Sequence, residues 1–590
     1  MNTLNRILEM ISYRENTDRE GFILREYKED QISEQADDSG PEDTETTDKP
    51  RAGRRKFVKP RRPGEKNQEG PDKKADPDEL DGHSLKESQT SASLKENRQA
   101  IKKLYHLPHN DDIIVRDFYL GMDRDYEGLA VFVDGLTNST IQDILFQSLM
   151  LLAIPPETER DKLTQTVMKS LLPGNQVQLI STYKDALAAI NMGDTVLFFD
   201  GCDKALGVET KGWEHRTVDV PITEQVIRGP QEAFTETLLT NTALLRKIIK
   251  NENLTAEYLS VGERSRTQIA VMYQRNLANP TLVEEVKRRI KSIKTDYVFD
   301  SGVLEQFIDD HPYNLHPTAL ATERPDRAAS KILEGRVVII VDGSPFVLTV
   351  PSTMYEQMQT GEELSVRWQF GTFIRWMRKL SFLLSLLLPG LYLAVVLYHQ
   401  EMIPTELVLA IAGNREKVPF PSIIEVLLME VSFELIREAG LRIPGVMGST
   451  IGIVGALILG QAAVQANIVS PILVIIVAIT GLASFAIPYF SLAFTLRIYR
   501  FIYIALGAAL GFFGIAIGLI VQVLLASNLK SFGVPYLAPG GPKTDDWTDI
   551  VSVAPVFFQE RRPDYVNPLD MTRQPKISRG WIRDGDNKDD

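Results

Sequence analysis

The chain has 590 residues, a formal net charge of -13 and 44% hydrophobic residues. The acidic balance argues against nucleic acid as a partner, because the summed negative field repels phosphate. The single cysteine, Cys202, excludes a disulfide framework and a multi-cysteine metal site, and we find no HExxH motif, phosphate-binding glycine loop or GxSxG motif. We therefore expect no catalytic centre, no cofactor and no metal site.

Residues 1–92 are predicted to form a disordered, charged extension. Residues 30–48 include eight acidic residues and no basic one, whereas residues 49–62 include eight basic residues and no acidic one. Such a segment buries too little apolar surface to offset its chain entropy. Near the start, apolar residues at helical spacing between Leu4 and Ile11 predict a short surface helix, with a membrane-surface or partner-docking helix as the alternative.

The next part of the chain is predicted to form two related α/β subdomains, residues 93–229 and 230–365. The strand that starts at Leu129 recurs at Ile269, and the Asp-Gly turn at Asp200 recurs at Asp342, so the offsets are 140 and 142 residues. A chance match of short apolar strands would explain one such pair. Two pairs at nearly constant spacing, with helical patterns between them, indicate a duplicated fold.

Residues 366–528 are predicted to form a helical transmembrane domain of about four spans, followed by a Pro-rich polar tail, residues 529–590. Uncharged runs cover residues 380–398, 443–496 and 501–528. A hydrocarbon core of about 30 Å needs roughly 20 apolar residues as helix, so the middle run is long enough for two spans.

The basic residues around the spans predict sidedness, with one conflict. Four of them precede the first span and place the N-terminal domain in the cytoplasm by the positive-inside rule: Arg367, Arg375, Arg378 and Lys379. Arg497 and Arg500 would then fall in a short outer loop, against that rule. A fifth crossing between Leu407 and Leu435 would repair this loop, but it would place the C-terminal tail outside. We favour four spans.

The segment Pro421–Gly440 is predicted to be an amphipathic helix with an acidic face. At about 100° per residue one arc carries Glu430, Glu434, Arg437 and Glu438, with Met429, Phe433 and Ile436 opposite. Copies in a ring would present these carboxylates to a cation path. The alternative is an interfacial helix in which Glu434 and Arg437 simply pair in water.

Glycines recur along the last run at Gly507, Gly511, Gly514 and Gly518. On one straight helix they would expose bare backbone on one face, which lets helices approach closely in lipid. The packing could be within one chain or between subunits.

Several motifs stand out along the chain: Arg228-Gly229-Pro230, Thr322-Glu323-Arg324-Pro325-Asp326-Arg327, Asp342-Gly343-Ser344-Pro345-Phe346 and Val418-Pro419-Phe420-Pro421. Together they resemble the A subunits of GerA-type spore germinant receptors, and the resemblance runs from about Arg98 to Pro555. Two departures are the Met272–Arg275 segment, where relatives usually have a Tyr, acidic, Gly-like turn, and the long charged extension.

The resemblance implies signalling and not catalysis. Such A subunits sit in the spore inner membrane with a permease-like B subunit and a lipoprotein C subunit, and the soluble domain is expected on the cytoplasmic (core) side. The resemblance also implies a homo-oligomeric, nutrient-gated channel that releases cations, in contact with membrane lipid. The alternatives are a stand-alone membrane solute permease and a membrane enzyme. A permease would typically show repeats of broken helices around a site at the bilayer midplane.

Overall fold

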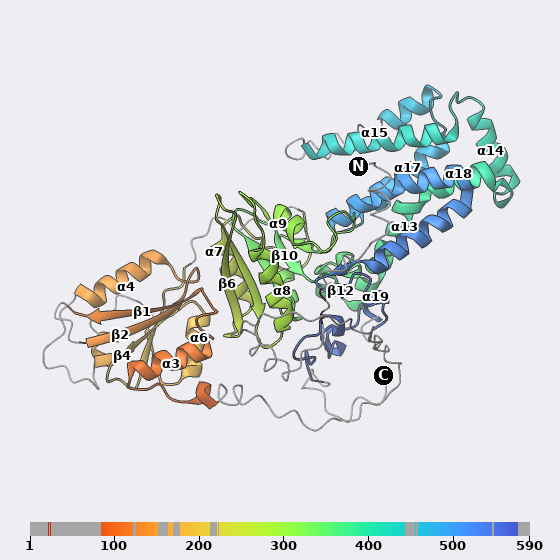
Figure 1. Ribbon diagram of the computed structural model, residues 1–590. Coiled ribbons are helices and arrows are strands. Elements are labelled where there is room, and N and C mark those ends of the chain that lie inside the picture. Colours follow the sequence, from red (N-terminus) through yellow and green to blue (C-terminus); the bar gives the residue numbers. More distant parts are fainter. Residues whose placement is uncertain are drawn as a thin grey trace, which may run out of the picture.

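The computed structural model describes residues 22, 24, 84–121, 126–151, 163–168, 177–212, 221, 223–442, 455, 458–544 and 548–575. Two α/β sheets come first along the chain, and a helical region follows (Figure 1). The predicted helix near Leu4 and most of the charged extension lie outside the described residues. The described structure begins before residue 93, however, because Gln89 forms a β-bridge with Thr182 and Lys86 pairs with Glu252.

The first sheet has five antiparallel strands in the order β1-β2-β4-β5-β3. The strands are β1 (Ile113–Leu120), β2 (Tyr126–Val133), β3 (Val177–Ile180), β4 (Thr195–Phe199) and β5 (Ala205–Val208). Its helices are α3 (Leu94–Leu104), α4 (Ser139–Leu151), α5 (Leu163–Thr166) and α6 (Tyr183–Asn191). One face of β2 packs through Leu129 and Val131 into a cluster with α3 and α6, and the other face packs through Phe132 into a cluster with α4. The sheet is therefore covered on both faces.

The second sheet repeats this strand order as β6-β7-β9-β10-β8. Its strands are β6 (Leu254–Val261), β7 (Thr267–Gln274), β8 (Leu320–Thr322), β9 (Val337–Val341) and β10 (Val347–Val350), and its helices are α7 (Leu238–Ile248), α8 (Pro280–Lys291), α9 (Ser301–Ile308) and α10 (Pro325–Ile332). Local signals define the helix starts: the Asn279 side chain accepts a hydrogen bond from the Thr281 amide ahead of Pro280, and Asp300 caps α9. The predicted pair of α/β units is confirmed.

A buried ion pair joins the two sheets. The Arg246 guanidinium on α7 donates to the Asp112 carboxylate just before β1 at 2.5 Å and to the Asn110 side chain at 2.9 Å. The Asp111 amide also donates to the Ala256 carbonyl on β6. The two subdomains therefore meet through paired polar groups, in addition to apolar packing.

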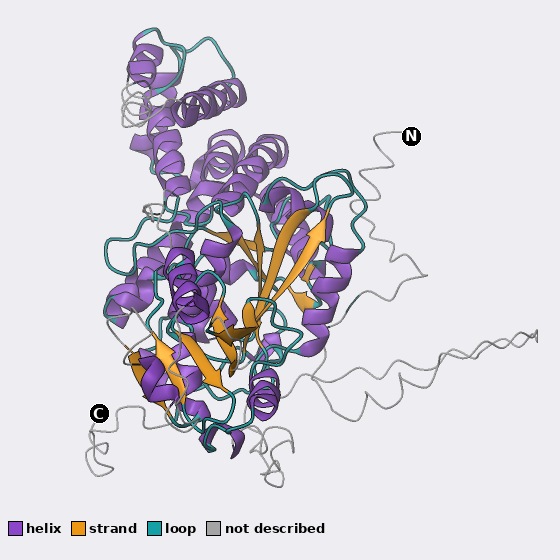
Figure 2. Ribbon diagram, turned by 90° about the vertical axis from the view of Figure 1, so that its left-hand side faces the viewer, coloured by secondary structure: helices purple, strands orange, loops and turns teal. Residues whose placement is uncertain are grey.

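The helical region begins with two short helices, α11 (Met354–Gln357) and α12 (Glu362–Ser365), and continues beyond the two sheets (Figure 2). Its longer helices are α13 (Trp368–Tyr398), α14 (Thr405–Arg415), α15 (Ser422–Arg442), α17 (Pro471–Phe485) and α18 (Phe490–Asn528). Within the described residues, α13 and α18 are long and apolar enough to cross a membrane, and α17 is a shorter apolar helix. The structure thus bears out long apolar helices and gives two of that length among the described residues. Residues 443–454 of the predicted second span lie outside the described residues, so the number of about four spans stays a prediction.

The helix α18 is a hairpin of two helical arms. Gly511 has a φ of 61° and a ψ of -142°, which interrupts the helix. The Tyr503 hydroxyl donates to the Gln522 side chain at 2.7 Å, although a straight helix would separate residues 19 positions apart by roughly 28 Å. The chain therefore folds back at Gly511, and the prediction of one straight span over residues 501–528 is wrong.

Arg497 and Arg500 lie inside the first arm of α18 and are buried. The expectation that they occupy a short outer loop is wrong. The helix continues through both residues because Arg500 finds an acidic partner on a neighbouring helix, which lets a charge lie among apolar helices.

The four glycines of residues 501–528 have different structural roles in the hairpin. A Cβ atom on Gly507 would lie 2.4 Å from the Gly390 carbonyl oxygen of α13. Gly511 makes the turn, and Gly514 and Gly518 face Leu506 and Tyr503 of the first arm. They do not form one stripe on a straight helix, and the close contacts seen here are within one chain.

We expect Gly507→Val to lower the amount of folded protein in the membrane. The added side chain would force the first arm of α18 away from α13, and overpacking of this kind costs about 1–3 kcal/mol. Gly413→Val on α14 is the matched control, because nothing lies within 4 Å of its Cβ position. Membrane abundance and the melting temperature of the purified chain test the prediction, and equal behaviour of the two variants would contradict it.

Both ends of the α18 hairpin rest on the second subdomain. Near the start, the Tyr489 hydroxyl donates to the Ala319 carbonyl at 3.2 Å, and past the end, the Ser531 hydroxyl donates to the Thr318 carbonyl at 2.6 Å. The tail then continues along the same subdomain, where the Leu569 amide donates to the Leu277 carbonyl. The two sheets and the C-terminal tail therefore lie at the same end of the helical region.

Candidate functional site

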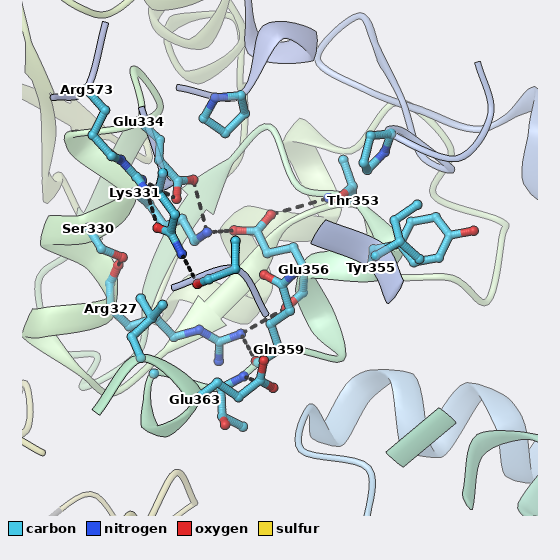
Figure 3. A pocket seen from close by; sticks show the side chains of 18 of the residues that line it. Arg327, Ser330, Lys331, Glu334, Thr353, Tyr355, Glu356, Gln359, Glu363 and Arg573 are labelled. Carbon is cyan, nitrogen blue, oxygen red and sulfur yellow. Dashed lines mark hydrogen bonds and ion pairs between the residues drawn. The ribbon is translucent and has the colours of Figure 1, made fainter. Parts of the chain in front are cut away.

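A pocket of about 580 Å³ lies where the second subdomain, the α11–α12 segment, the start of α13 and the C-terminal tail meet (Figure 3). Most of its lining residues are charged or polar. Lining residues include Arg327, Lys331, Glu334, Glu356, Glu363, Arg375 and Arg573. These side chains come from segments far apart in the sequence, so the pocket marks the joint between the α/β region and the helical region.

The charges around the pocket are paired with one another. Arg336 donates to Glu356 at 2.5 Å, and Lys331 lies 3.1 Å from Glu356 and 3.0 Å from Glu334. Arg573 of the tail lies 3.4 Å from Glu334. Figure 3 shows Lys331 between the two carboxylates. We call Lys331, Glu334, Arg336 and Glu356 the junction cluster.

Electrostatics keep the carboxylates of the junction cluster ionised. Burial disfavours the charged form of Glu334, but the positive charges of Lys331, Arg336 and Arg573 outweigh this and lower its pKa to about 2. Burial likewise opposes ionisation of Glu356, and Arg336 and Lys331 nevertheless lower its pKa. Because each charge has an opposite partner, the cluster ties segments together and offers no free group for proton transfer.

The Glu323–Arg327 motif connects this cluster to the joint between the subdomains. Arg324 donates to the Pro230 carbonyl at 3.0 Å and to Asp326 at 2.8 Å. Glu323 accepts a hydrogen bond from the Thr223 amide at 3.1 Å. The structure thus brings Arg324 to Pro230 of the predicted Arg228-Gly229-Pro230 motif and Glu323 to Thr223, a few residues before it.

Arg327 reaches in two directions from α10. It pairs with Glu224 at 2.5 Å, and it donates to the carbonyls of Glu356 and Gln359 in the segment that leads to α13. Gly229 has a φ of 145°, which a residue with a side chain rarely adopts, and Arg228 is exposed beside it. One arginine therefore links the subdomain joint to the segment that enters the helical region.

The Asp342–Pro345 turn has a local structural task. Asp342 accepts a hydrogen bond from the Leu238 amide at the start of α7. The Gly343 backbone has a φ of 86°, and its amide donates to the Glu236 carbonyl. The Ser344 and Ser301 hydroxyls are 3.0 Å apart. The turn lies away from the pocket-lining residues, as do Pro419 and Pro421, which lie in the connection from α14 to α15.

Two of the four basic residues before the first uncharged run are held by one carboxylate. Glu363 of α12 accepts hydrogen bonds from Arg375 at 2.6 Å and from Arg378. The Trp376 indole, which like Arg375 and Arg378 belongs to α13, donates to the Val551 carbonyl of the tail at 2.8 Å. The start of α13 is therefore fixed both to α12 and to the C-terminal tail.

A second polar assembly lies among the helices and centres on α15. Glu430 is fully buried, and its carboxylate accepts a hydrogen bond from Arg500 of α18 at 2.7 Å. Arg500 also donates to the Ser385 carbonyl of α13 at 2.8 Å. This buried ion pair joins three helices.

The pairing continues in both directions along α15. Toward its end, Arg437 lies 3.0 Å from Glu434 and donates to the Ser484 hydroxyl at 2.9 Å. Near its start, Glu425 accepts a hydrogen bond from the Ser470 amide at 3.1 Å. We call Glu425, Glu430, Glu434, Arg437 and Arg500 the polar seam.

The orientation of α15 differs from that of an amphipathic helix in water. Its exposed side chains include Ile424, Leu428, Val431 and Leu435, whereas Glu430 and Met429 are both buried. The predicted acidic arc is therefore not a solvent-facing surface, because Glu430 of that arc is as buried as Met429, which was predicted on the opposite side. In an apolar surrounding the charged arc turns inward and the apolar side turns outward. Glu438 is the exposed member of the predicted arc.

Sequence reasoning identified Glu430, Glu434 and Arg437 but missed their partners. Arg500 was assigned to a loop, and Ser385 and Ser484 carry no signal in a single sequence. A charge inside an otherwise apolar stretch was the available clue to Arg500. Within the described parts of the chain, no group of His, Cys, Asp and Glu side chains is arranged to hold a metal ion.

Comparisons with known proteins agree with the motifs. The family model described as "Bacillus/Clostridium GerA spore germination protein" matches residues 99–565. The chain is 40% identical over 502 residues to "Spore germination protein KA" of Bacillus subtilis (strain 168), which covers 83% of this chain and 91% of that protein. It is 41% identical over 475 residues to "Uncharacterized membrane protein YfkQ" of the same organism, with 80% and 91% covered.

A solved structure is also similar. The N-terminal domain of the A subunit of the Bacillus megaterium spore germinant receptor GerK3 is 30% identical, with a TM-score of 0.33. The match covers 45% of this chain and 96% of that one.

Proposed function

Because the chain belongs to the GerA family of spore germination proteins, we propose that it is the A subunit of a nutrient-responsive germinant receptor in the spore inner membrane. It acts there as the oligomeric, channel-forming subunit that couples germinant sensing to cation release. Its partners are a permease-like B subunit and a lipoprotein C subunit. The soluble subdomains face the cytoplasm, which is the spore core.

The observation that carries this proposal is the polar seam. Placing ionisable side chains among membrane helices costs free energy, so such side chains usually line or control a pathway for ions or substrates. Here three carboxylates follow one helix, Glu425, Glu430 and Glu434, and two of them are held by arginines at 3.0 Å or less. A cation path along this seam is closed while the arginines occupy the carboxylates, and it opens when the helices move apart.

The junction cluster supplies the coupling. Arg327 and Arg336 join the second subdomain to the segment before α13, and the tail after α18 packs on the same cluster through Arg573. A movement of the subdomain is therefore transmitted to both the first and the last membrane helices. This connection is a set of direct contacts between charged groups, which the charge-pair variants in the Discussion test.

The experiment is a double substitution, Glu434→Gln with Glu438→Gln. Glutamine keeps the approximate size and polarity and removes the negative charge that concentrates cations. We expect nutrient-triggered release of monovalent cations to slow markedly at unchanged abundance of the subunit. Glu430 is left intact in this variant, because its removal would leave Arg500 without a carboxylate partner. At position 434 the glutamine oxygen can still accept a hydrogen bond from Arg437, which also donates to the Ser484 hydroxyl.

Glu406→Gln is the matched control, because this exposed carboxylate lies on α14, outside the polar seam. It should leave cation release unchanged. Spores carrying each variant are compared for cation release and for the amount of the subunit in their membranes. Normal release at normal abundance in the double variant would remove Glu434 and Glu438 from the mechanism.

A further inference from the structure

Exposed apolar side chains gather on the second subdomain beside the foot of α18. Phe307 at the end of α9 is 49% exposed, and Tyr313 and Leu315 in the following segment are 82% and 41% exposed. On α18 itself, Phe490 and Phe494 are 53% and 48% exposed, with ring centroids 5.9 Å apart. We call these five residues the apolar rim.

The segment that carries Tyr313 and Leu315 is attached to the first arm of the α18 hairpin and to the chain that follows the second arm. The Thr495 hydroxyl donates to the Leu315 carbonyl at 2.5 Å, and His316 stacks on Tyr499 with centroids 5.4 Å apart. Beyond the second arm, the Phe532 amide donates to Asp310 at 2.8 Å. The exposed side chains are therefore held in place and do not belong to an unattached loop.

Contacts between α13 and the first arm of α18 show at which height along these helices the segment with Tyr313 and Leu315 is attached. Arg500 meets Ser385, Gly507 meets Gly390, and the Tyr398 hydroxyl donates to the Ala508 carbonyl, so α13 and the first arm of α18 run in the same direction. Leu380 lies five residues before Ser385 on α13, and Thr495 lies five residues before Arg500 on α18. Leu380 and Thr495 are therefore at about the same height along the two parallel helices. Leu380 is the first residue of the uncharged run of α13.

Leu315 consequently lies at the height at which the membrane-crossing part of α13 begins. Trp376 and Phe373, which are 57% and 61% exposed, lie one to two turns below that height on α13. Trp and Tyr rings, which have a polar group on an apolar ring, are enriched at this boundary between hydrocarbon and water, and Trp376 is such a ring.

We propose that the apolar rim is a lipid-binding surface that rests in the interfacial layer of the bilayer. Phe307 and Leu315 contact the upper acyl chains, and Tyr313 places its ring among them with its hydroxyl at the headgroups. The second subdomain is thus anchored to the membrane directly, as well as through α13 and α18. This inference goes beyond the proposed function and does not depend on whether the chain conducts cations.

Burial of the neighbouring histidine is compatible with this location. His316 is 3% exposed, and burial lowers its pKa to about 4, so it is neutral at physiological pH. Other titratable groups near the segment are Glu305, whose pKa burial raises to about 7, Asp309, which accepts a hydrogen bond from Thr318, and Asp310, which is paired with Arg289. Burial therefore favours the neutral form of Glu305, and the charge of Asp310 is compensated by Arg289.

The test measures lipid contact at single labelled positions of the full chain in lipid nanodiscs. Cys202 is first replaced by Ser, and an environment-sensitive fluorophore is then attached to Tyr313→Cys or Phe307→Cys. Tyr119→Cys is the matched control, because this tyrosine of β1 is 48% exposed on the first subdomain. Phospholipids with a spin label near the headgroup serve as quenchers.

We expect most of the emission at residues 313 and 307 to be lost when spin-labelled lipid is present and emission at residue 119 to be unchanged. If spin-labelled lipid leaves the emission at residue 313 as unchanged as the emission at residue 119, the proposal is overturned. Shielding of residue 313 that appears only after other spore membrane proteins are added would assign the surface to a protein partner and would overturn it as well. Because Tyr313 is largely exposed, its replacement should leave folding intact, which the melting temperature checks.

Discussion

Arg500→Met is expected to remove most of the protein from the membrane. The substitution leaves the Glu430 carboxylate buried without the guanidinium that lies 2.7 Å away, and breaking a buried pair in this way costs about 3–5 kcal/mol. Methionine fills much of the same volume, so the loss comes from the unpaired charge and not from a cavity. Immunoblots of membrane fractions and the melting temperature of the purified chain measure the effect.

Two further variants isolate the charge pair. Glu430→Met combined with Arg500→Met removes both charges and should restore most of the abundance, because apolar replacements of a buried pair are often neutral or stabilising. Arg497→Met is the matched control on the same helix, because Arg497 has no carboxylate within ion-pair distance among the described residues. If Arg497→Met is as harmful as Arg500→Met, or if the double variant is not rescued, the pair is not what holds these helices together.

The second large effect is expected for Arg336→Met in the junction cluster. Arg336 is 1% exposed, and it donates to Glu356, to the Pro351 carbonyl and to the Tyr565 hydroxyl of the tail. Loss of the guanidinium leaves Glu356 buried with Lys331 as its remaining ion-pair partner, so we expect a destabilisation of about 3 kcal/mol or more. The tail should also become accessible to protease, because one of its contacts with the second subdomain is lost.

Arg264→Met is the control for this variant. Arg264 lies 3.5 Å from Asp296, but its side chain is 84% exposed, and exposed pairs of this kind contribute about 0–1 kcal/mol. Limited proteolysis and thermal unfolding of the full chain compare the two variants. An unchanged melting temperature and an unchanged cleavage pattern for Arg336→Met would show that the junction cluster does not hold the tail.

The sequence by itself determined the features that are local or periodic. The strand that starts at Leu129 resembles the one that starts at Ile269, and the Asp-Gly turn at Asp200 resembles the one at Asp342. These similarities revealed the two α/β units, because a strand or a turn can be recognised from a few consecutive residues. The uncharged runs revealed the membrane helices, and contiguous motifs such as Glu323–Arg327 revealed the family. Each of these signals can be recognised without knowing what the segment contacts.

Only the tertiary structure decided how the helices are arranged. The run over residues 501–528 has the composition of one span, and it is the contact of Tyr503 with Gln522 that shows the turn at Gly511. Composition identifies an apolar run, whereas its path depends on which residues it packs against.

The polar seam was hidden for the same reason. Arg500 and Glu430 are 70 residues apart in the chain, and a periodicity analysis of α15 assigns an acidic face without saying what that face meets. In water the charged arc would face solvent, but among apolar surroundings it turns toward Arg500 and Ser484. The direction in which a charged face points is set by the medium and by long-range partners, and neither is encoded in a local pattern.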